Sequence, residues 1–325
     1  MNDDNYLPVR HPLVIVGIGG AGSKIAVDAS KSLNCKCVLI SNDKNDLKGN
    51  YQSIFINSDS WINPSSYKIR SFVQSSTKGI KAAIDGFQTI IVITNLAGRS
   101  GTAMSPIVSR LAKHSGATTI ILFAIMPFGF EKDRIFHAGI SLKRLRKIAD
   151  ATIVIDNDTL LENNPELSPR ECYGITNRAI CEVISTISEG HIHPDMNILF
   201  AGKKDTDSVE SSIKDSIEML YDNVDPNSIK RALLYVMGGE NVPIGKLNFI
   251  VSTVQEIFTE EKTPEVVLAM SDSKRITVHL MATVQDKTRF DKYDPLSEII
   301  PQQNVLDWEE LDSSPDIEMT IPNLE

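Results

Sequence analysis

The sequence predicts an α/β fold built on a doubly wound parallel sheet. Short, almost wholly apolar segments alternate with helical segments through the first half of the chain, which is typical of parallel strands buried on both faces. Glycine-rich turns follow two of the apolar segments, at residues 17–22 and 97–103. A strand, a glycine-rich turn and a helix N-terminus together attract phosphate, because backbone N–H groups converge there and no Cβ blocks the approach.

The composition is that of a soluble globular protein. The 325 residues are 42% hydrophobic and 23% charged, and no apolar run is long enough to span a membrane. The four cysteines lack zinc or redox spacing, and the acidic N-terminus is unlike a signal peptide, so we expect a cytoplasmic protein. Residues 294–325 carry nine acids and no lysine or arginine, which accounts for the whole net charge of −9. The neutral remainder gives no sign of a nucleic-acid partner.

Residues 1–167 are predicted to form the nucleotide-binding domain. Its strands are apolar and rich in β-branched residues, and we expect them at 13–16, 35–40, 89–94, 118–126 and 151–155, with a short apolar run at 54–56. Helices are expected at 23–30, 65–84 and 140–148, and another helix has Pro106 in its first turn, where proline is tolerated.

Residues 168–190 are predicted to form a long central helix that connects two parts of the molecule. Ser168, Pro169 and Glu171 supply an N-cap, a proline at the first helical position and a capping box. Beyond it, a smaller C-terminal α+β domain is expected over residues 191–285, followed by a disordered acidic tail over 286–325. In that domain we expect strands at 197–201 and 232–237, helices at 208–221 and 244–258, and a strand pair formed by 266–270 and 276–284.

The first glycine-rich turn is compatible with more than one ligand. Gly17, Gly19 and Gly22 fit the dinucleotide fingerprint, and Asp43 follows the second strand where a ribose-binding acid would lie. An NAD(P)-binding oxidoreductase is therefore one alternative, and a tight turn without a ligand is another. The second turn at 97–103 favours a nucleoside triphosphate, since three phosphates need a larger cradle than a dinucleotide does.

These motifs, taken in order, resemble the tubulin/FtsZ superfamily, which includes the archaeal CetZ proteins. Residues 17–24 look like its first phosphate loop, 97–103 occupy the place of its G-G-G-T-G-T-G signature, and 127–131 are similar to its P-F-x-F-E segment. The strand ending in Asn157-Asp158 and the positions of Tyr173 and Asn177 also match. The resemblance implies GTP or GDP as ligand, with Mg²⁺ as a candidate companion ion. The nucleotide-binding residues that it implies are Gly19, Gly20, Ala21, Gly22, Asn42, Ala97, Gly98, Arg99, Ser100, Gly101, Thr102, Glu131, Arg134, Asn157, Tyr173 and Asn177.

The chain departs from the family pattern in two loops. In the signature loop Arg99 replaces a glycine, and this arginine either clamps a phosphate or fills the space that a phosphate needs. In the loop after the central helix, Asp195 stands for the first catalytic acid, while His193 replaces an asparagine and Ile198 lies where the second acid belongs. Water activation through this loop should therefore be poor.

A metal site at His191, His193 and Asp195 is an alternative that we disfavour, because no third strong ligand is evident beside the two histidines. Polar loop residues between the two parts of the molecule are the preferred interpretation, and we assign no metal ligand.

The resemblance implies a cytoskeletal or cell-division protein of archaeal type that assembles head to tail, with weak or absent GTP hydrolysis. A non-hydrolysing scaffold or regulator of another filament is the nearest alternative. In the tail, the apolar segments Val305–Trp308 and Ile317–Pro322 are spaced like short motifs that bind a protein partner.

Overall fold

The computed structural model describes residues 6–58, 64–187, 192–202, 209–238, 243–257, 265–269, 276–284 and 288–293. Within these ranges, ten strands form one sheet in the order β3-β2-β1-β4-β5-β6-β7-β10-β8-β9. All pairs from β3 to β7 are parallel, so the predicted parallel α/β fold is confirmed. The strands are β1 Leu13–Ile18, β2 Lys36–Ser41, β3 Gln52–Phe55, β4 Thr89–Asn95, β5 Thr119–Ile125, β6 Ala151–Ile155, β7 Asp195–Phe200, β8 Ile229–Met237, β9 Glu265–Ala269 and β10 Thr277–Val284.

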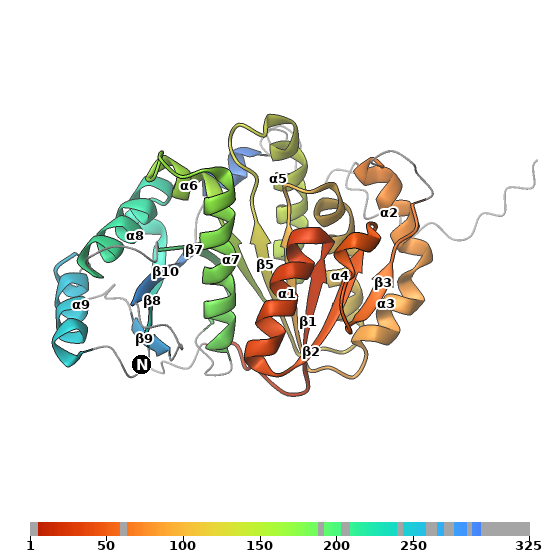
Figure 1. The fold of residues 1–325 in the computed structure, drawn as a ribbon, viewed down its shortest axis with the longest axis horizontal. Helices are drawn as coiled ribbons and strands as arrows, with labels where there is room; N and C mark the ends of the chain where they lie inside the picture. Colours follow the sequence, from red (N-terminus) through yellow and green to blue (C-terminus); the bar gives the residue numbers. More distant parts are fainter. Residues whose placement is uncertain are drawn as a thin grey trace, which may run out of the picture.

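Helices cover both faces of the sheet. One face packs against α1 (Gly19–Leu33) and α7 (Pro169–Ser185), where Ile25 and Ile180 belong to the same hydrophobic cluster. The other face packs against α2 (Ser66–Ser75), α3 (Thr77–Ile84), α4 (Arg99–His114), α5 (Lys132–Ile148) and α8 (Val209–Asn223). Strands β1, β5 and β6 are apolar at nearly every position because alternate side chains enter two different cores. In Figure 1, α7 stands between the β1–β5 half and the β8–β10 half.

The strand order reverses between β1 and β4, which are neighbours in the sheet although β2 and β3 intervene in the chain. The helix after β1 lies on one face and the helix after β4 lies on the other. Such a switch point opens a crevice at the carboxyl ends of the strands, where ligands bind in open α/β sheets.

Two helices begin earlier than their periodicity predicts. α1 begins at Gly19 and α4 at Arg99, so most of each glycine-rich segment forms a first helical turn. Pro106 consequently lies inside α4 and not in its first turn, and it cannot donate to the carbonyl of Thr102. The Ser141 hydroxyl of α5 donates to that carbonyl at 3.1 Å instead. The predicted helix over 65–84 is divided into α2 and α3, with Ser76 between them.

The C-terminal strands extend the same sheet. β7 pairs in parallel with β6 and antiparallel with β10, and β10 pairs antiparallel with β8. The predicted pairing of 266–270 with 276–284 is wrong, because β9 pairs with β8 at the edge. β10 is buried at every position, which suits a strand with a neighbour on each side. The division into 1–167, 168–190, 191–285 and 286–325 stays a prediction.

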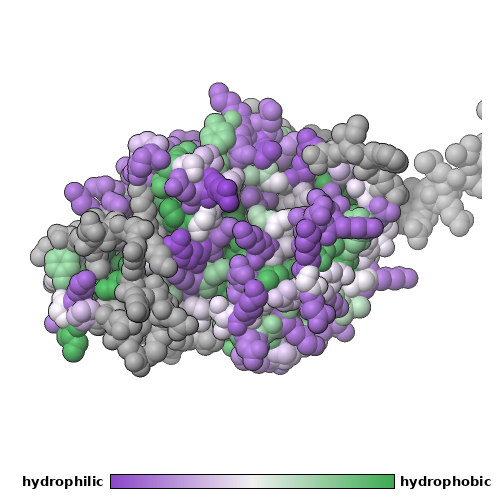
Figure 2. All heavy atoms as spheres, in the orientation of Figure 1, coloured by the Kyte–Doolittle hydropathy of each residue, from purple (hydrophilic) through white to green (hydrophobic). Residues whose placement is uncertain are grey.

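Several predicted features lie outside the described residues: the end of the central helix at 188–190, His191, the tail, and its segments Val305–Trp308 and Ile317–Pro322. Within the described part of the chain, no helix is both long and apolar enough to cross a membrane. Figure 2 shows hydrophilic side chains spread over the face in view. Exposed large hydrophobic residues include Ile244 and Phe249 of α9 (Ile244–Ile257).

Candidate functional site

The phosphate end of the candidate site is formed where α1 and α4 begin. Ile18 and Thr94 are paired at the ends of β1 and β4, so the two helices start side by side at the same edge of the sheet. Gly19 has a φ of 69°, which favours glycine, and a Cβ added there would lie 3.2 Å from the Cβ of Ser100. Two helix N-termini, each favouring an anion, therefore lie side by side.

Two of the predicted phosphate-binding glycines have a packing role. A Cβ at Gly22 would lie 2.4 Å from the carbonyl oxygen of Ile93, and one at Gly101 would lie 2.0 Å from that of Asn95. Both oxygens belong to β4, so these glycines let α1 and α4 pack directly against the strand backbone. Phosphate contact through these two residues stays a prediction.

The second loop forms its own network of contacts. The backbone N–H of Ala97 donates to Asn95 Oδ1 at 2.8 Å. The Thr102 hydroxyl bonds to the carbonyls of Gly98 and Arg99, each at 3.1 Å. Arg99 is exposed at the start of α4, and both alternatives for it, the phosphate clamp and the side chain that fills the phosphate space, stay predictions.

Asn42 and Asp46 flank the phosphate end from the β2 side. The Ser100 hydroxyl donates to Asn42 Oδ1, which brings this predicted residue to the second loop. Asp46 closes the 3-10 turn η1 (Lys44–Asp46), and its Oδ1 would lie 2.8 Å from a Cβ at Gly20. Its other oxygen accepts from the Ser41 hydroxyl at 2.6 Å. The sequence analysis missed Asp46, although its spacing from the end of β2 placed it within reach.

The nucleoside end is formed by the segment after β5 and the start of α7. Glu131 accepts the Phe128 N–H at 3.1 Å through one oxygen and pairs with Arg134 at 2.6 Å through the other. Phe128 stacks on Phe130, with ring centroids 5.0 Å apart, and meets the Tyr173 ring edge-on at 5.2 Å. Burial raises the pKa of Tyr173, and the Glu131 carboxylate raises it further. Glu131, Arg134 and Tyr173 thus lie together, as the resemblance implies.

Asn157 and Asn177 differ in how their amides are satisfied. Asn157 is fully buried; its Nδ2 donates to the Met126 carbonyl at 3.4 Å, and its Oδ1 accepts from the Thr176 hydroxyl at 2.7 Å. It therefore ties the end of β5 to α7, and a contact with a base stays a prediction. Asn177 Oδ1, one turn from Tyr173 on α7, is buried without a hydrogen-bond partner. An orphaned acceptor of this kind fits a ligand that brings N–H donors.

Asp195 lies at the opposite edge of the sheet. It begins β7 and pairs with Ala151, the first residue of β6, so it lies at the amino ends of these strands. The other predicted residues lie at or beyond the carboxyl ends of the strands, or in the helices near those ends. Its carboxylate faces Lys230 at 3.4 Å and lines a polar pocket with Asp150. His193 is buried against the Tyr6 ring, and its Nε2 lies 3.4 Å from the Arg231 guanidinium, which disfavours a cation.

The chain is similar to known proteins in sequence and in fold. The model of the Tubulin/FtsZ family, GTPase domain, matches residues 12–165. The cell division protein FtsZ 2 of Halobacterium salinarum is 25% identical over 283 residues, which cover 75% of this chain and 68% of that protein. The cell division protein FtsZ of Haloferax mediterranei is 28% identical over 200 residues, covering 56% and 53%.

Two solved structures share the fold. The empty FtsZ dimer of M. jannaschii has a TM-score of 0.66 at 23% identity, covering 85% of this chain and 88% of that one. CetZ2 of Haloferax volcanii, in a GTPγS-bound protofilament, has a TM-score of 0.64 at 17% identity, covering 87% and 97%. The family match, the archaeal relatives and the shared fold agree with the order of motifs, and the chain is a member of the tubulin/FtsZ superfamily.

Proposed function

We propose that the chain binds GTP or GDP and acts as a cytoskeletal or cell-division protein of the archaeal FtsZ and CetZ type, in the cytoplasm. The observation that carries the proposal is the buried, unpartnered Asn177 Oδ1, one helical turn from Tyr173. Guanine brings the N–H donors that such an acceptor lacks, and the Tyr173 ring offers a face for stacking. The adjacent N-termini of α1 and α4 would hold the phosphates, and membership of the superfamily argues against the oxidoreductase alternative.

Mg²⁺ is the companion ion that we propose. Magnesium in nucleotide sites usually takes one or two carboxylates together with substrate phosphates. The Asp46 carboxylate lies beside Gly20 at the start of α1, and it would hold the ion there. Without a cation, this carboxylate would repel a phosphate at the same helix N-terminus.

Self-association would place subunits head to tail. Asp195 lies at the amino ends of the strands, and the proposed nucleotide residues lie at the carboxyl ends. This arrangement is needed if one subunit completes the site of the next. Hydrolysis should be weak or absent, because Asp195 is paired with Lys230 and the position of a second acid is taken by the apolar, buried Ile198. The same pairing favours the second candidate function, a non-hydrolysing scaffold or regulator of another filament. A protein partner at the tail also remains part of the proposal.

Calorimetric titration of the full chain with GDP, GTP and NAD⁺ tests the nucleotide assignment. We expect GDP and GTP to bind and NAD⁺ not to, and preferential binding of NAD⁺ would contradict the proposal. Asn177→Leu should lose most of the affinity for GDP, whereas Asn177→Asp should retain part of it because the acceptor is kept. Phosphate release that rises more steeply than protein concentration would indicate sites completed between subunits and exclude the non-hydrolysing alternative.

A further inference from the structure

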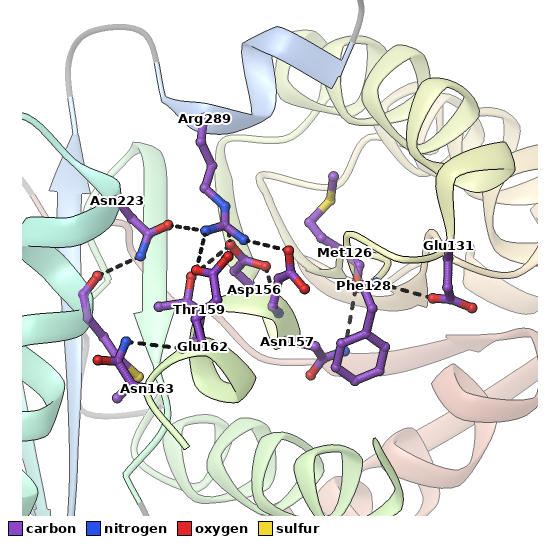
Figure 3. A network of polar contacts seen from close by, with 12 residues as sticks. Met126, Phe128, Glu131, Asp156, Asn157, Thr159, Glu162, Asn163, Asn223 and Arg289 are labelled. Carbon is purple, nitrogen blue, oxygen red and sulfur yellow. Dashed lines mark hydrogen bonds and ion pairs between the residues drawn. The ribbon is translucent and has the colours of Figure 1, made fainter. Parts of the chain in front are cut away.

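Arg289 joins the C-terminal segment of the described chain to the carboxyl end of β6. It lies in the 3-10 turn η6 (Arg289–Tyr293), and Figure 3 shows its side chain reaching toward Asp156, Glu162 and Asn223. Its Nε lies 2.6 Å from Asp156, its Nη2 lies 3.2 Å from Asp158, and its Nη1 lies 3.1 Å from Glu162. Nη1 also donates to Asn223 Oδ1 of α8 at 2.7 Å. The Arg289 guanidinium thus contacts three carboxylates and the side-chain amide of Asn223.

The innermost of these contacts holds the start of a helix. Asp156 is the N-cap of α6 (Asn157–Glu162): it accepts the N–H of Asp158 at 3.0 Å and the hydroxyl of Thr159 at 2.8 Å. Its side chain is only 2% exposed, whereas that of Glu162 is 58% exposed. A buried carboxylate that loses its cationic partner is strongly unfavourable, so the position of Asp156 depends on Arg289 far more than that of Glu162 does.

The start of α6 is in turn attached to the nucleoside end of the candidate site. Asn157 lies between Asp156 and Asp158 in the chain. Its amide donates to the Met126 carbonyl, as Figure 3 shows, and accepts from the Thr176 hydroxyl of α7. Asp158 Oδ2 would lie 2.5 Å from a Cβ at Gly129, so it packs against the segment that carries Glu131. One guanidinium therefore supports both the helix and the loop that border this end.

We propose that Arg289 is a positioning residue of the guanosine-binding end: through Asp156 and Asp158 it holds the start of α6, and with it the orientation of α7 and of the loop before Glu131. The inference rests on the proposed guanine-nucleotide binding. Arg289 itself does not touch the nucleotide in this scheme. The C-terminal segment of the chain, far from the glycine-rich loops in sequence, thereby takes part in base selectivity.

Arg289→Met and Arg289→Lys in the full chain test the proposal, with Lys113→Met as the matched control. Lys113 also pairs with an aspartate at 2.6 Å, Asp150, but in a more exposed ion pair and at the amino ends of the strands. Competition binding with GDP, IDP and pyrophosphate separates the two ends of the site, since IDP lacks the exocyclic amino group and pyrophosphate lacks the nucleoside. Hydrogen exchange of the α6 amides reports on the helix start without any nucleotide.

In Arg289→Met we expect affinity for GDP to fall about tenfold and the preference for GDP over IDP to shrink, while pyrophosphate affinity changes less than about twofold. The Asp158 amide should exchange faster in this variant and not in Lys113→Met. Arg289→Lys should retain part of the preference for GDP over IDP, because one carboxylate can still be paired. If Arg289→Met does not fold, the same measurements are made on Arg289→Lys.

Unchanged GDP affinity and exchange in folded Arg289→Met would overturn the proposal. An equal loss of GDP and pyrophosphate binding would do the same, because it would indicate a general structural role. Failure of the wild-type chain to bind GDP would instead refute the proposed function, and the positioning inference with it.

Discussion

The buried carboxyl group of Asp156 should make stability depend on pH in a way that one substitution can isolate. Burial raises the pKa of Asp156 from 3.8 to about 6, and the Arg289 guanidinium and the hydrogen bonds from Thr159 and Asp158 only partly offset that rise. Between these two pKa values the folded state binds more protons than the unfolded state, so stability falls as pH rises. The loss reaches about 3 kcal/mol in full, and about 2 kcal/mol of it falls between pH 4.5 and 7.5.

Urea unfolding of the wild type and of Asp156→Asn, followed by circular dichroism at pH 4.5 and 7.5, measures this contribution. Asparagine keeps the shape and the acceptor oxygen but does not titrate. We expect the stability of the wild type, relative to the variant, to fall by about 2 kcal/mol from the lower pH to the higher. Asp195→Asn is the control, because the Asp195 side chain is exposed and its substitution should not produce this change in stability with pH. A relative stability that is constant within about 0.5 kcal/mol would refute the reasoning, because it would mean that the guanidinium fully compensates burial.

Three further outcomes are expected. Gly22→Ala should destabilise the fold by about 3 kcal/mol or more, since its Cβ would collide with the Ile93 carbonyl. The control Gly79→Ala, whose added Cβ meets open space in α3, should raise the melting temperature. Equal effects of the two substitutions on stability would contradict the packing argument. His279→Leu should cost about 2–3 kcal/mol in chemical unfolding, because the buried ring accepts the Gly202 N–H and pairs with Glu182 of α7; a neutral result would mean that neither contact matters. Asp46→Asn should bind GDP several-fold more tightly in EDTA and lose the Mg²⁺ dependence of binding, and a variant that keeps this dependence would exclude Asp46 as a magnesium ligand.

The N-terminal strands and their order of appearance followed from the sequence because both faces of the sheet are buried. β4, β5 and β6 are buried along almost their whole length, so the apolar runs mark them plainly. The capping box at Ser168 and Glu171 likewise identified the start of α7, since an N-cap is a local interaction between residues three apart.

The helix starts and the strand neighbours were harder to predict. Glycine lowers the apparent helical character of 19–22 and 99–101, yet these residues join α1 and α4 because the helices pack tightly on β4. The sequence adjacency of 266–270 and 276–284 predicted a pair, whereas the sheet places fully buried β10 between β7 and β8. Such choices depend on which long-range contacts bury the most apolar surface.

The sequence alone was sufficient for the superfamily and the α/β class, and it supplied the candidate residues of the proposed nucleotide site, because these depend on local motifs and on their order along the chain. Only the tertiary structure brought Asp46 to the start of α1, left Asn177 Oδ1 without a partner, and joined Arg289 to Asp156 across more than a hundred residues. A hydrogen bond or an ion pair between distant segments leaves no periodic pattern in the sequence. Its existence is decided by how the sheet and helices pack, and that packing is a property of the whole fold.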